Sequence, residues 1–341
     1  MNPVVSIITP SFNRADIIHE TAESIFKQTY PHWEWMIVDD GSTDNSWELI
    51  KSYAEKDSRV RVFQRDRDPK GAAVCRNIAV EKATGKYVIF LDTDDLLASF
   101  CIEQRVKAAE SEVNADVVIF PMLMFKTEPT DLGLLWNIDK DRDDIERILF
   151  GDAICQGTGT IWKRDKFLEV GAWRQDLAVW QDVELHLRTM IGDVIYKKRM
   201  DLKPDIFLRI SDVSLSRTGY HSINKWRSRV KVLLQTIEGL KEKGQLAKYI
   251  HGIQNVAVDL VTGGVKSGYW AEVSDLTKTL GRNGVLNESQ QTFFKRYMLF
   301  RRLKGYKINS LDRLFDTRIQ KMITPYDNTL NKVVYEGEIV I

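Results

Sequence analysis

The chain has 341 residues, of which 43% are hydrophobic and 28% charged, so it is long enough to bury one large core or two modest ones. Its 49 Lys and Arg residues balance 48 Asp and Glu residues, and the formal net charge of +1 gives no general argument for a nucleic-acid or acidic partner. Three cysteines without a CxxC pair indicate neither a disulfide framework nor a zinc site and favour a reducing compartment.

The N-terminal stretch, MNPVVSIITPSF, has neither the basic flank nor the apolar length of a secretion signal. No apolar stretch approaches the roughly 20 residues that a membrane-spanning helix needs. We therefore expect a soluble, cytoplasmic chain without a nucleic-acid partner, which could still contact the inner face of a membrane peripherally.

Strand and helix patterns alternate through the first 122 residues. β-branched and apolar runs predict strands, and amphipathic runs between them predict helices. The strands are expected at 4–10, 33–40, 59–65, 86–92 and 115–122, and the clearest helices at 15–28, 46–56 and 71–85. This alternation is typical of a mostly parallel, doubly wound α/β sheet with helices on both faces. Ligands of such sheets bind beyond the carboxyl ends of the strands.

The second part of the chain is less regular and then becomes helical. Residues 157–164 and 205–212 are predicted to contain strands, and residues 182–192 a helix. From about Ser222 the pattern is mainly helical. We therefore predict an α/β domain over 1–221 and a mainly helical region over 222–341, which would be available for contacts with a substrate, within a homodimer or with a membrane surface.

An acidic cluster follows the fourth predicted strand, in FLDTDD at residues 90–95. Asp92, Asp94 and Asp95 stay ionised together cheaply only if they reach water or share a cation. Carboxylate oxygens suit Mg²⁺ or Mn²⁺, which usually complete their coordination with water and substrate phosphates. The alternative is a solvated acidic turn before the next helix. The position after a buried strand favours the cation.

Two further motifs lie at strand or helix ends. In VDDGSTD, at 38–44, the Asp39 carboxylate can accept from a uracil N3–H or a ribose hydroxyl, whereas the residues after it fit a turn and helix N-cap. KGAAVCRN, at 70–77, lacks both the P-loop and the GxGxxG pattern. Its Lys70 and Arg76 lie near a helix start that favours phosphate. The alternative is an ordinary amphipathic helix.

In this order, VSIITPSFNR, VDDGSTD, KGAAVCRN and FLDTDD resemble the nucleotide-binding half of family 2 glycosyltransferases, the inverting GT-A class. The resemblance covers residues 1 to about 220 and implies a GT-A fold. It also implies a hexosyltransferase that moves a sugar from a nucleotide-diphosphate donor, a UDP-sugar, to a hydroxyl of a saccharide or lipid-linked acceptor. Enzymes of this kind build bacterial surface polysaccharide and glycolipid.

The same resemblance implies roles for individual residues. The Phe12 ring would stack on the base, Asp39 would read the base edge, and Asp94 would hold Mn²⁺ or Mg²⁺. Asp92 would reach the ribose or the metal, and Asp95 is a further candidate for the metal. The full set expected to bind the nucleotide is Thr9, Pro10, Phe12, Asp39, Lys70, Gly71, Arg76 and Asp92.

A general base is expected in AVWQDVELHLR, at 178–188, which resembles the ED-x-x-L-x-x-R helix start of the family. The matching base is Asp182, and the alternative role for this residue is a helix N-cap. Gln181 stands where Glu is usual. Losing that neighbouring charge should leave Asp182 easier to ionise.

A second departure lies in LRISDVSLS, at 208–216, where many relatives carry R-x-H-x-x-S. Ser211 stands at the His position, Arg209 could still approach phosphate, and His221 could replace the missing imidazole. GTGT, at 157–160, matches the region that lines the donor-sugar and acceptor cleft; a flexible turn is the alternative.

Two segments of the helical region mix aromatic and basic residues, WRSRVKVLL at 226–234 and FFKRYMLFRRLKGYK at 293–307. We favour amphipathic helices that pack on the catalytic domain or on a second subunit. The alternative is docking on an anionic membrane.

Two other functions compete with glycosyl transfer. A non-catalytic nucleotide-binding module is favoured only by Gln181 and Ser211. A sugar nucleotidyltransferase would usually show a basic, Gly-rich loop near the N-terminus, and VSIITPSFNR has none.

Overall fold

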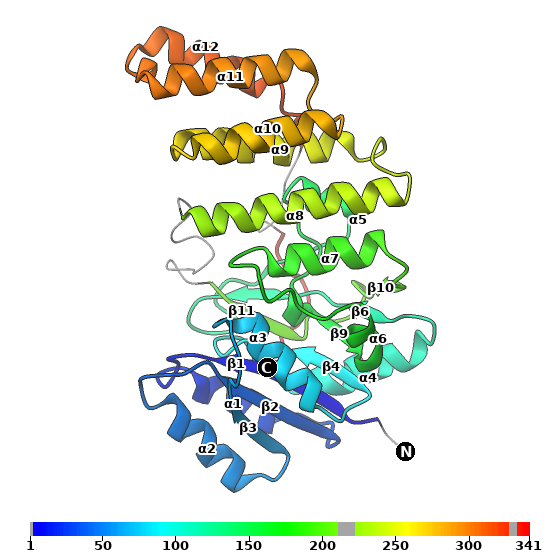
Figure 1. Ribbon diagram of the computed structural model, residues 1–341. Helices are drawn as coiled ribbons and strands as arrows, with labels where there is room; N and C mark the ends of the chain where they lie inside the picture. Colours follow the sequence, from blue (N-terminus) through cyan, green and yellow to red (C-terminus); the bar gives the residue numbers. More distant parts are fainter. Residues whose placement is uncertain (1–2, 211–221, 327–332) are drawn as a thin grey trace.

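The computed structural model describes residues 3–210, 222–326 and 333–341 (Figure 1). A seven-stranded sheet has the order β10-β6-β9-β4-β1-β2-β3. Strands β1 to β4 are mutually parallel, which confirms the predicted α/β sheet. The bounds are β1 Val5–Ser11, β2 Trp33–Asp39, β3 Val60–Gln64, β4 Tyr87–Phe90, β6 Val117–Ile119, β9 Thr160–Lys163 and β10 Tyr196–Lys198.

Helices cover both faces of this sheet, because the side chains of each strand alternate between the faces. Val5 and Ile7 of β1 pack in the core under α1, α2 and α4, whereas Ile8 packs in a second core under α3 and α6. The bounds are α1 Ile18–Phe26, α2 Ser46–Lys56, α3 Ala72–Lys82, α4 Cys101–Ser111 and α6 Arg164–Glu169.

Strand β9 interrupts the parallel part of the sheet. It lies between β4 and β6 and is antiparallel to both, so the fourth and fifth predicted strands are not neighbours. The predicted strand at 115–122 is also shorter, because the chain leaves the sheet after Ile119.

A four-stranded second sheet, with the order β5-β11-β7-β8, follows the acidic cluster. Its strands are β5 Leu96–Leu97, β7 Leu123–Phe125, β8 Leu134–Leu135 and β11 Ile206–Arg209. Residues 333–341 return to this sheet: the Leu135 amide donates to the Val333 carbonyl at 2.8 Å, and the Tyr335 amide to Gly133 at 2.8 Å. The predicted region 222–341 is therefore helical only in part, and its last described residues belong with the α/β part.

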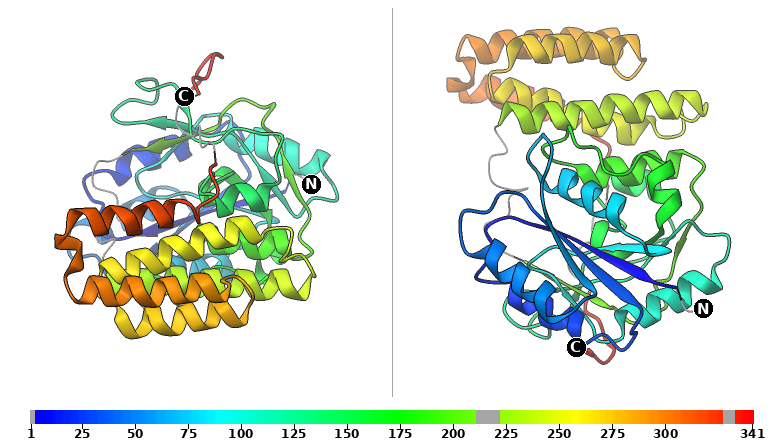
Figure 2. Two further views of the ribbon diagram at one scale, coloured as in Figure 1. Left: turned by 90° about the horizontal axis from the view of Figure 1, so that it is seen from above. Right: turned by 60° about the horizontal axis from the view of Figure 1, so that its bottom comes forward.

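The remaining helices form a stack above α5 Asp144–Leu149 and α7 Gln181–Ile191 (Figures 1 and 2). One hydrophobic core runs from α5 and α7 through the stack, so buried residues on both sides of the predicted boundary at 221 pack together. Trp226, Val232 and Leu233 are buried in it, which confirms packing for the segment 226–234. The stack comprises α8 Ile223–Glu242, α9 Ile250–Lys266, α10 Trp270–Arg282, α11 Glu288–Arg302 and α12 Asn309–Gln320.

Within the described ranges, none of the helices combines the length and apolar character needed to span a bilayer.

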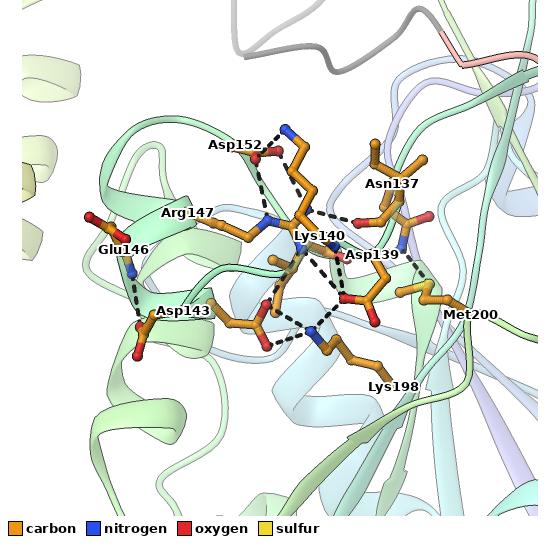
Figure 3. Close-up of polar contacts among 12 residues, drawn as sticks. Asn137, Asp139, Lys140, Asp143, Glu146, Arg147, Asp152, Lys198 and Met200 are labelled. Carbon is orange, nitrogen blue, oxygen red and sulfur yellow. Dashed lines mark hydrogen bonds and ion pairs between the residues drawn. The ribbon is translucent and has the colours of Figure 1, made fainter. Parts of the chain in front are cut away.

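A polar cluster lies beside α5 (Figure 3), and contacts from the stack side join it to the helices. The buried Arg147 contacts Asp152 at 3.3 Å, and Lys140 contacts the same carboxylate at 2.6 Å. From the stack side, Tyr326 donates to Asp152 at 2.9 Å, and Lys248 pairs with Asp143 at 2.7 Å. These opposite charges satisfy one another, so the cluster has a structural explanation without a ligand.

A second buried ion pair, between Arg105 of α4 and Asp205, joins the two sheets. Both side chains are fully buried, and two nitrogens of Arg105 donate to Asp205 at 2.6 and 3.0 Å. Arg105 Nη1 also donates to the carbonyls of Thr158 and Thr160 at 2.8 and 3.1 Å. Since Asp205 immediately precedes β11, this guanidinium fixes the second sheet against the start of β9.

We expect Asp205→Asn to lower the free energy of unfolding by about 3–5 kcal/mol, because it leaves the Arg105 charge buried without a counter-charge. Urea denaturation would measure the change. The control is Asp201→Asn in the same loop: Asp201 pairs with Arg199 at 2.8 Å but is 62% exposed, and its loss should cost less than about 1 kcal/mol. Equal costs would contradict the importance given to the buried pair.

Candidate active site

The predicted site residues gather at the carboxyl ends of β1, β2 and β4. Asp39 ends β2 and is only 1% exposed. One of its oxygens accepts from the amides of Gly41 and Ser42 at 2.9 Å each, and the other accepts from the Ser42 hydroxyl at 2.5 Å. Gly41 has φ of +80°, which the tight turn needs. The Asp39 carboxylate therefore stabilises the turn that follows β2.

The predicted base pocket is only partly formed by the side chains expected there. Thr9 is fully buried, and its hydroxyl accepts from Trp35 Nε1 at 2.9 Å, so this side chain faces the core and not a pocket. Pro10 is half-buried. Phe12 is 41% exposed, and the Lys70 ammonium lies 3.4 Å from the centre of its ring. A base stacked on the same face of Phe12 would displace Lys70.

Gly71 lies at the N-terminal end of α3, with φ of +148°. No atom lies within 4 Å of the position that a Cβ would occupy. The backbone conformation, and not a crowded neighbour, therefore explains the glycine at this helix start.

Arg76 of α3 connects the acidic cluster with the predicted base. Its Nη2 donates to Asp92 at 2.5 Å, its side chain is 12% exposed, and the guanidinium lies 5.0 Å from the centre of the Trp173 ring. Burial opposes the charge of Arg76, but the carboxylates of Asp92 and Asp182 more than offset this and raise its pKa. Its Nε has no hydrogen-bond partner in the described part of the chain.

The three carboxylates of the cluster do not share one environment. Asp95 is buried, and its carboxylate accepts from the Arg209 amide of β11 at 3.0 Å. Burial and the charges of Asp94 and Asp92 raise the pKa of Asp95 well above its usual range. This contact gives Asp95 a structural role, to hold the turn against the second sheet.

Asp94 is the carboxylate that best suits a cation. Burial, followed by the charge of Asp92, raises its pKa, while Arg14 opposes the shift. Among the described residues, no side chain donates a hydrogen bond to the Asp94 carboxylate; Arg209 donates to its backbone carbonyl instead. The same residues contain no group of three or more His, Cys, Asp or Glu side chains that could hold a metal ion by themselves. Asp94 and Asp92 therefore fit a divalent ion that takes its other ligands from water and substrate oxygens.

Arg209, the candidate for a phosphate contact, is engaged by protein groups. It donates to the Asp94 carbonyl at 3.1 Å, to the Lys126 carbonyl at 3.0 Å and to Glu20 at 2.5 Å. Ser211 and His221, the other candidates from this segment, lie outside the described residues.

Asp182 lies in the first turn of α7, but it does not cap that helix. The N-cap residue is Trp180, without a side-chain cap, and the Asp182 carboxylate instead accepts from the Gly157 amide at 2.9 Å. Gly157 begins the short 3₁₀ turn η1 Gly157–Gly159, so the predicted GTGT segment and the predicted base meet. Gln181 points back along the chain and donates to the Leu177 carbonyl at 2.8 Å.

The close approach at Gly157 explains why this residue is glycine. A Cβ there would lie 3.0 Å from the Trp173 ring and 3.2 Å from the Asp182 carboxylate. Trp173 therefore contacts both Arg76 and the loop that holds Asp182. Sequence reasoning missed Trp173, because its nearest functional partners are remote in the chain.

The sequence analysis also missed a buried pair near Asp182, formed by Cys155 and His186. His186 Nε2 lies 3.3 Å from the Cys155 sulfur, and both residues are buried. Burial lowers the pKa of His186, although the Asp182 charge raises it, and burial with the Asp182 charge raises the pKa of Cys155. The spacing of His186 four residues after Asp182, on one helical face, was the available signal.

Known sequences resemble the first half of the chain. The family model described as glycosyl transferase family 2 matches residues 6–171. The putative teichuronic acid biosynthesis glycosyltransferase TuaG of Bacillus subtilis is 48% identical over 105 residues, covering 31% of this chain and 41% of that protein. WfaP of Escherichia coli, named as a UDP-Glc:α-D-GlcNAc-diphosphoundecaprenol β-1,3-glucosyltransferase, is 40% identical over 109 residues, covering 32% and 42%. The alignments thus span about two fifths of these relatives.

Comparison with solved structures extends over nearly the whole chain. Residues 1–349 of TarS from S. aureus, in complex with UDP-GlcNAc, superpose with a TM-score of 0.65 at 17% identity, covering 98% of both chains. The mannosyltransferase PcManGT from Pyrobaculum calidifontis, in complex with GDP-Man and Mn²⁺, gives 0.50 at 19% identity, covering 90% and 88%. At these identities the likeness concerns the fold, and it confirms the GT-A type with a helical region.

Proposed function

Residues 6–171 belong to glycosyl transferase family 2, and from this premise we propose that the chain transfers a hexose from a UDP-sugar to an acceptor hydroxyl. The transfer inverts the anomeric carbon, uses Mn²⁺ or Mg²⁺, and has a saccharide or lipid-linked acceptor. The name of WfaP, which includes a UDP-sugar and a diphospholipid-linked acceptor, supports this donor and this acceptor class. The UDP-GlcNAc and UDP complexes of TarS support the donor.

The observation that carries the proposal is the contact of Arg76 with Asp92, together with its electrostatic coupling to Asp182. The first carboxylate belongs to the proposed diphosphate end of the site, and the second is the proposed base. Arg76 is a buried cation, and the charges of the two carboxylates raise its pKa. In the proposed reaction, Arg76 would also stabilise the negative charge that develops on the departing diphosphate, in a site of low dielectric.

In the proposed step, the Asp182 carboxylate takes the proton of the acceptor hydroxyl while the hydroxyl oxygen attacks the anomeric carbon. The bond from that carbon to the diphosphate oxygen breaks, and the electron pair leaves with UDP. The Gly157 amide holds one oxygen of Asp182 at 2.9 Å, so the base has a fixed orientation. Asp94 and Asp92 would hold the metal ion, which would offset charge on the leaving diphosphate.

The first experiment is calorimetric titration of UDP, GDP and CDP with and without Mn²⁺, on the wild type and Asp94→Ala. We expect UDP binding that needs both Mn²⁺ and Asp94. Because burial and Asp92 raise the pKa of Asp94, this binding should weaken as the pH falls toward that raised pKa, where protons displace the metal. Asp193→Ala, a change at an exposed surface pair, is the control. If Mn²⁺ does not increase the binding of any of the three nucleotides, the result would instead support a non-catalytic nucleotide-binding module.

We expect Asp182→Asn to lower UDP release from the preferred UDP-sugar and acceptor by about 10²–10⁴-fold, since the amide cannot accept the hydroxyl proton. UDP binding should be unchanged, because the Asn oxygen can still accept from Gly157. Gln181→Glu, which installs the residue usual in the family, should keep activity. Full turnover by Asp182→Asn would place the base elsewhere.

Gly157→Ala tests the orientation of the base. The added methyl group meets Trp173 and Asp182, and the displaced carboxylate should cost on the order of 10²-fold in turnover. Gly263→Ala is the matched control, because no atom lies within 4 Å of its Cβ position in α9. Similar turnover in the two variants would show that the contact at Gly157 does not position Asp182.

A further inference from the structure

The outer end of the helical stack is formed by α11, α12 and the short turn η2 Gly305–Lys307 between them (Figures 1 and 2). The inner side of this pair is packed: Phe293, Phe294 and Tyr297 are buried, and the rings of Phe300 and Phe315 stack at 4.5 Å. For the segment 293–307, the sequence analysis favoured packing and gave membrane docking as the alternative. The buried rings show that one side of this segment is packed.

The other side of the pair exposes apolar residues. Of the thirteen large hydrophobic residues that are exposed in the described ranges, six fall between 299 and 314. Leu303 is 72% exposed and Leu314 is 65% exposed. We call this set the tip surface; its apolar members are Leu299, Leu303, Tyr306, Ile308, Leu311 and Leu314. Single exposed hydrophobics are ordinary, but such a concentration marks an interaction surface.

The tip surface is also strongly basic. Residues 288–323 contain nine Lys and Arg residues and three acidic residues, whereas the whole chain carries a net charge of only +1. Arg302, Lys304 and Lys307 are exposed among the apolar residues. One of the three carboxylates, Asp312, is already paired with Arg301 at 3.4 Å.

A groove of about 850 Å³ lies between α11 and α12. Phe293, Phe315 and Leu314 form apolar walls, and Arg296, Arg318 and Lys321 supply cations beside them. Glu288 is the one acidic residue among those that line it. An apolar groove with a basic rim suits an amphiphile that has an anionic head.

We propose that the tip surface docks the chain on a bilayer that contains anionic lipids. The exposed Leu and Ile side chains enter the interface between headgroups and acyl chains, and the Lys and Arg residues meet lipid phosphates. A second copy of the chain fits less well, because two surfaces of the same strong positive charge repel each other. A soluble polyanion would match the charge but leaves the exposed leucines without a partner. The inference is independent of the proposed reaction.

The test is flotation of the full chain with vesicles of phosphatidylcholine alone or with phosphatidylglycerol. We expect binding only to the anionic vesicles, with a loss at high salt. Each Lys near such a surface contributes about fivefold to partitioning, so Lys304→Glu with Lys307→Glu should weaken it by at least roughly 25-fold. Leu303→Ser with Leu314→Ser should also weaken it. The controls are Lys27→Glu with Lys51→Glu and Val113→Ser, which change exposed side chains far from the tip in sequence.

Three results would overturn the proposal. The first is absent binding to anionic vesicles, or binding that the tip variants leave unchanged. The second is a dimer in sedimentation equilibrium that the leucine variants dissociate, which would assign the surface to a second copy. The third is binding to soluble heparin that needs the lysines but not the leucines, without vesicle binding. Urea denaturation of each variant separates these outcomes from misfolding.

Discussion

The buried pair of Arg105 and Asp205 is the constraint on which the site depends. Taking these charges out of water is costly, and only their bidentate contact with the two further carbonyl acceptors makes the arrangement stable. The carbonyls belong to Thr158 and Thr160, next to the Gly157 amide that holds Asp182. On the other side, Asp205 leads into β11, whose Arg209 amide holds Asp95. One guanidinium thus supports both ends of the site.

The acidic cluster shows how three carboxylates that lie close together in the sequence can have different surroundings in the fold. Asp92 contacts Arg76, and Asp95 accepts from a backbone amide, whereas burial and the charge of Asp92 raise the pKa of Asp94 against the opposing charges of Arg14 and Arg209. The fold thus gives the three like charges of one motif three different surroundings.

Much of the fold, and the candidates for the site, could be predicted from the sequence, because both predictions depend on local patterns. Strand periodicity predicted β1 to β4, and the family motifs pointed to Asp92, Asp94 and Asp182. The place of β9 was not predictable, since antiparallel insertion between β4 and β6 is set by long-range packing and leaves no periodic signal. The inward side chain of Thr9 was missed because strand register decides which face each residue takes. Trp173 and Gly157 come together only through tertiary contacts.

The return of the chain to the second sheet has a consequence for how the helical stack can vary. Tyr326, which stacks on Phe150 at 4.6 Å, and the segment 333–341 anchor the far side of the stack to the α/β part. The helices between Ile223 and Gln320 are therefore followed by segments that contact the α/β part again. An insertion or deletion in this helical stack must bring the chain back to the same place. Adding or removing a whole antiparallel helix pair meets this condition. A single added helix would carry the return segment to the wrong side, whereas an added pair would extend the reach of the tip without disturbing the site.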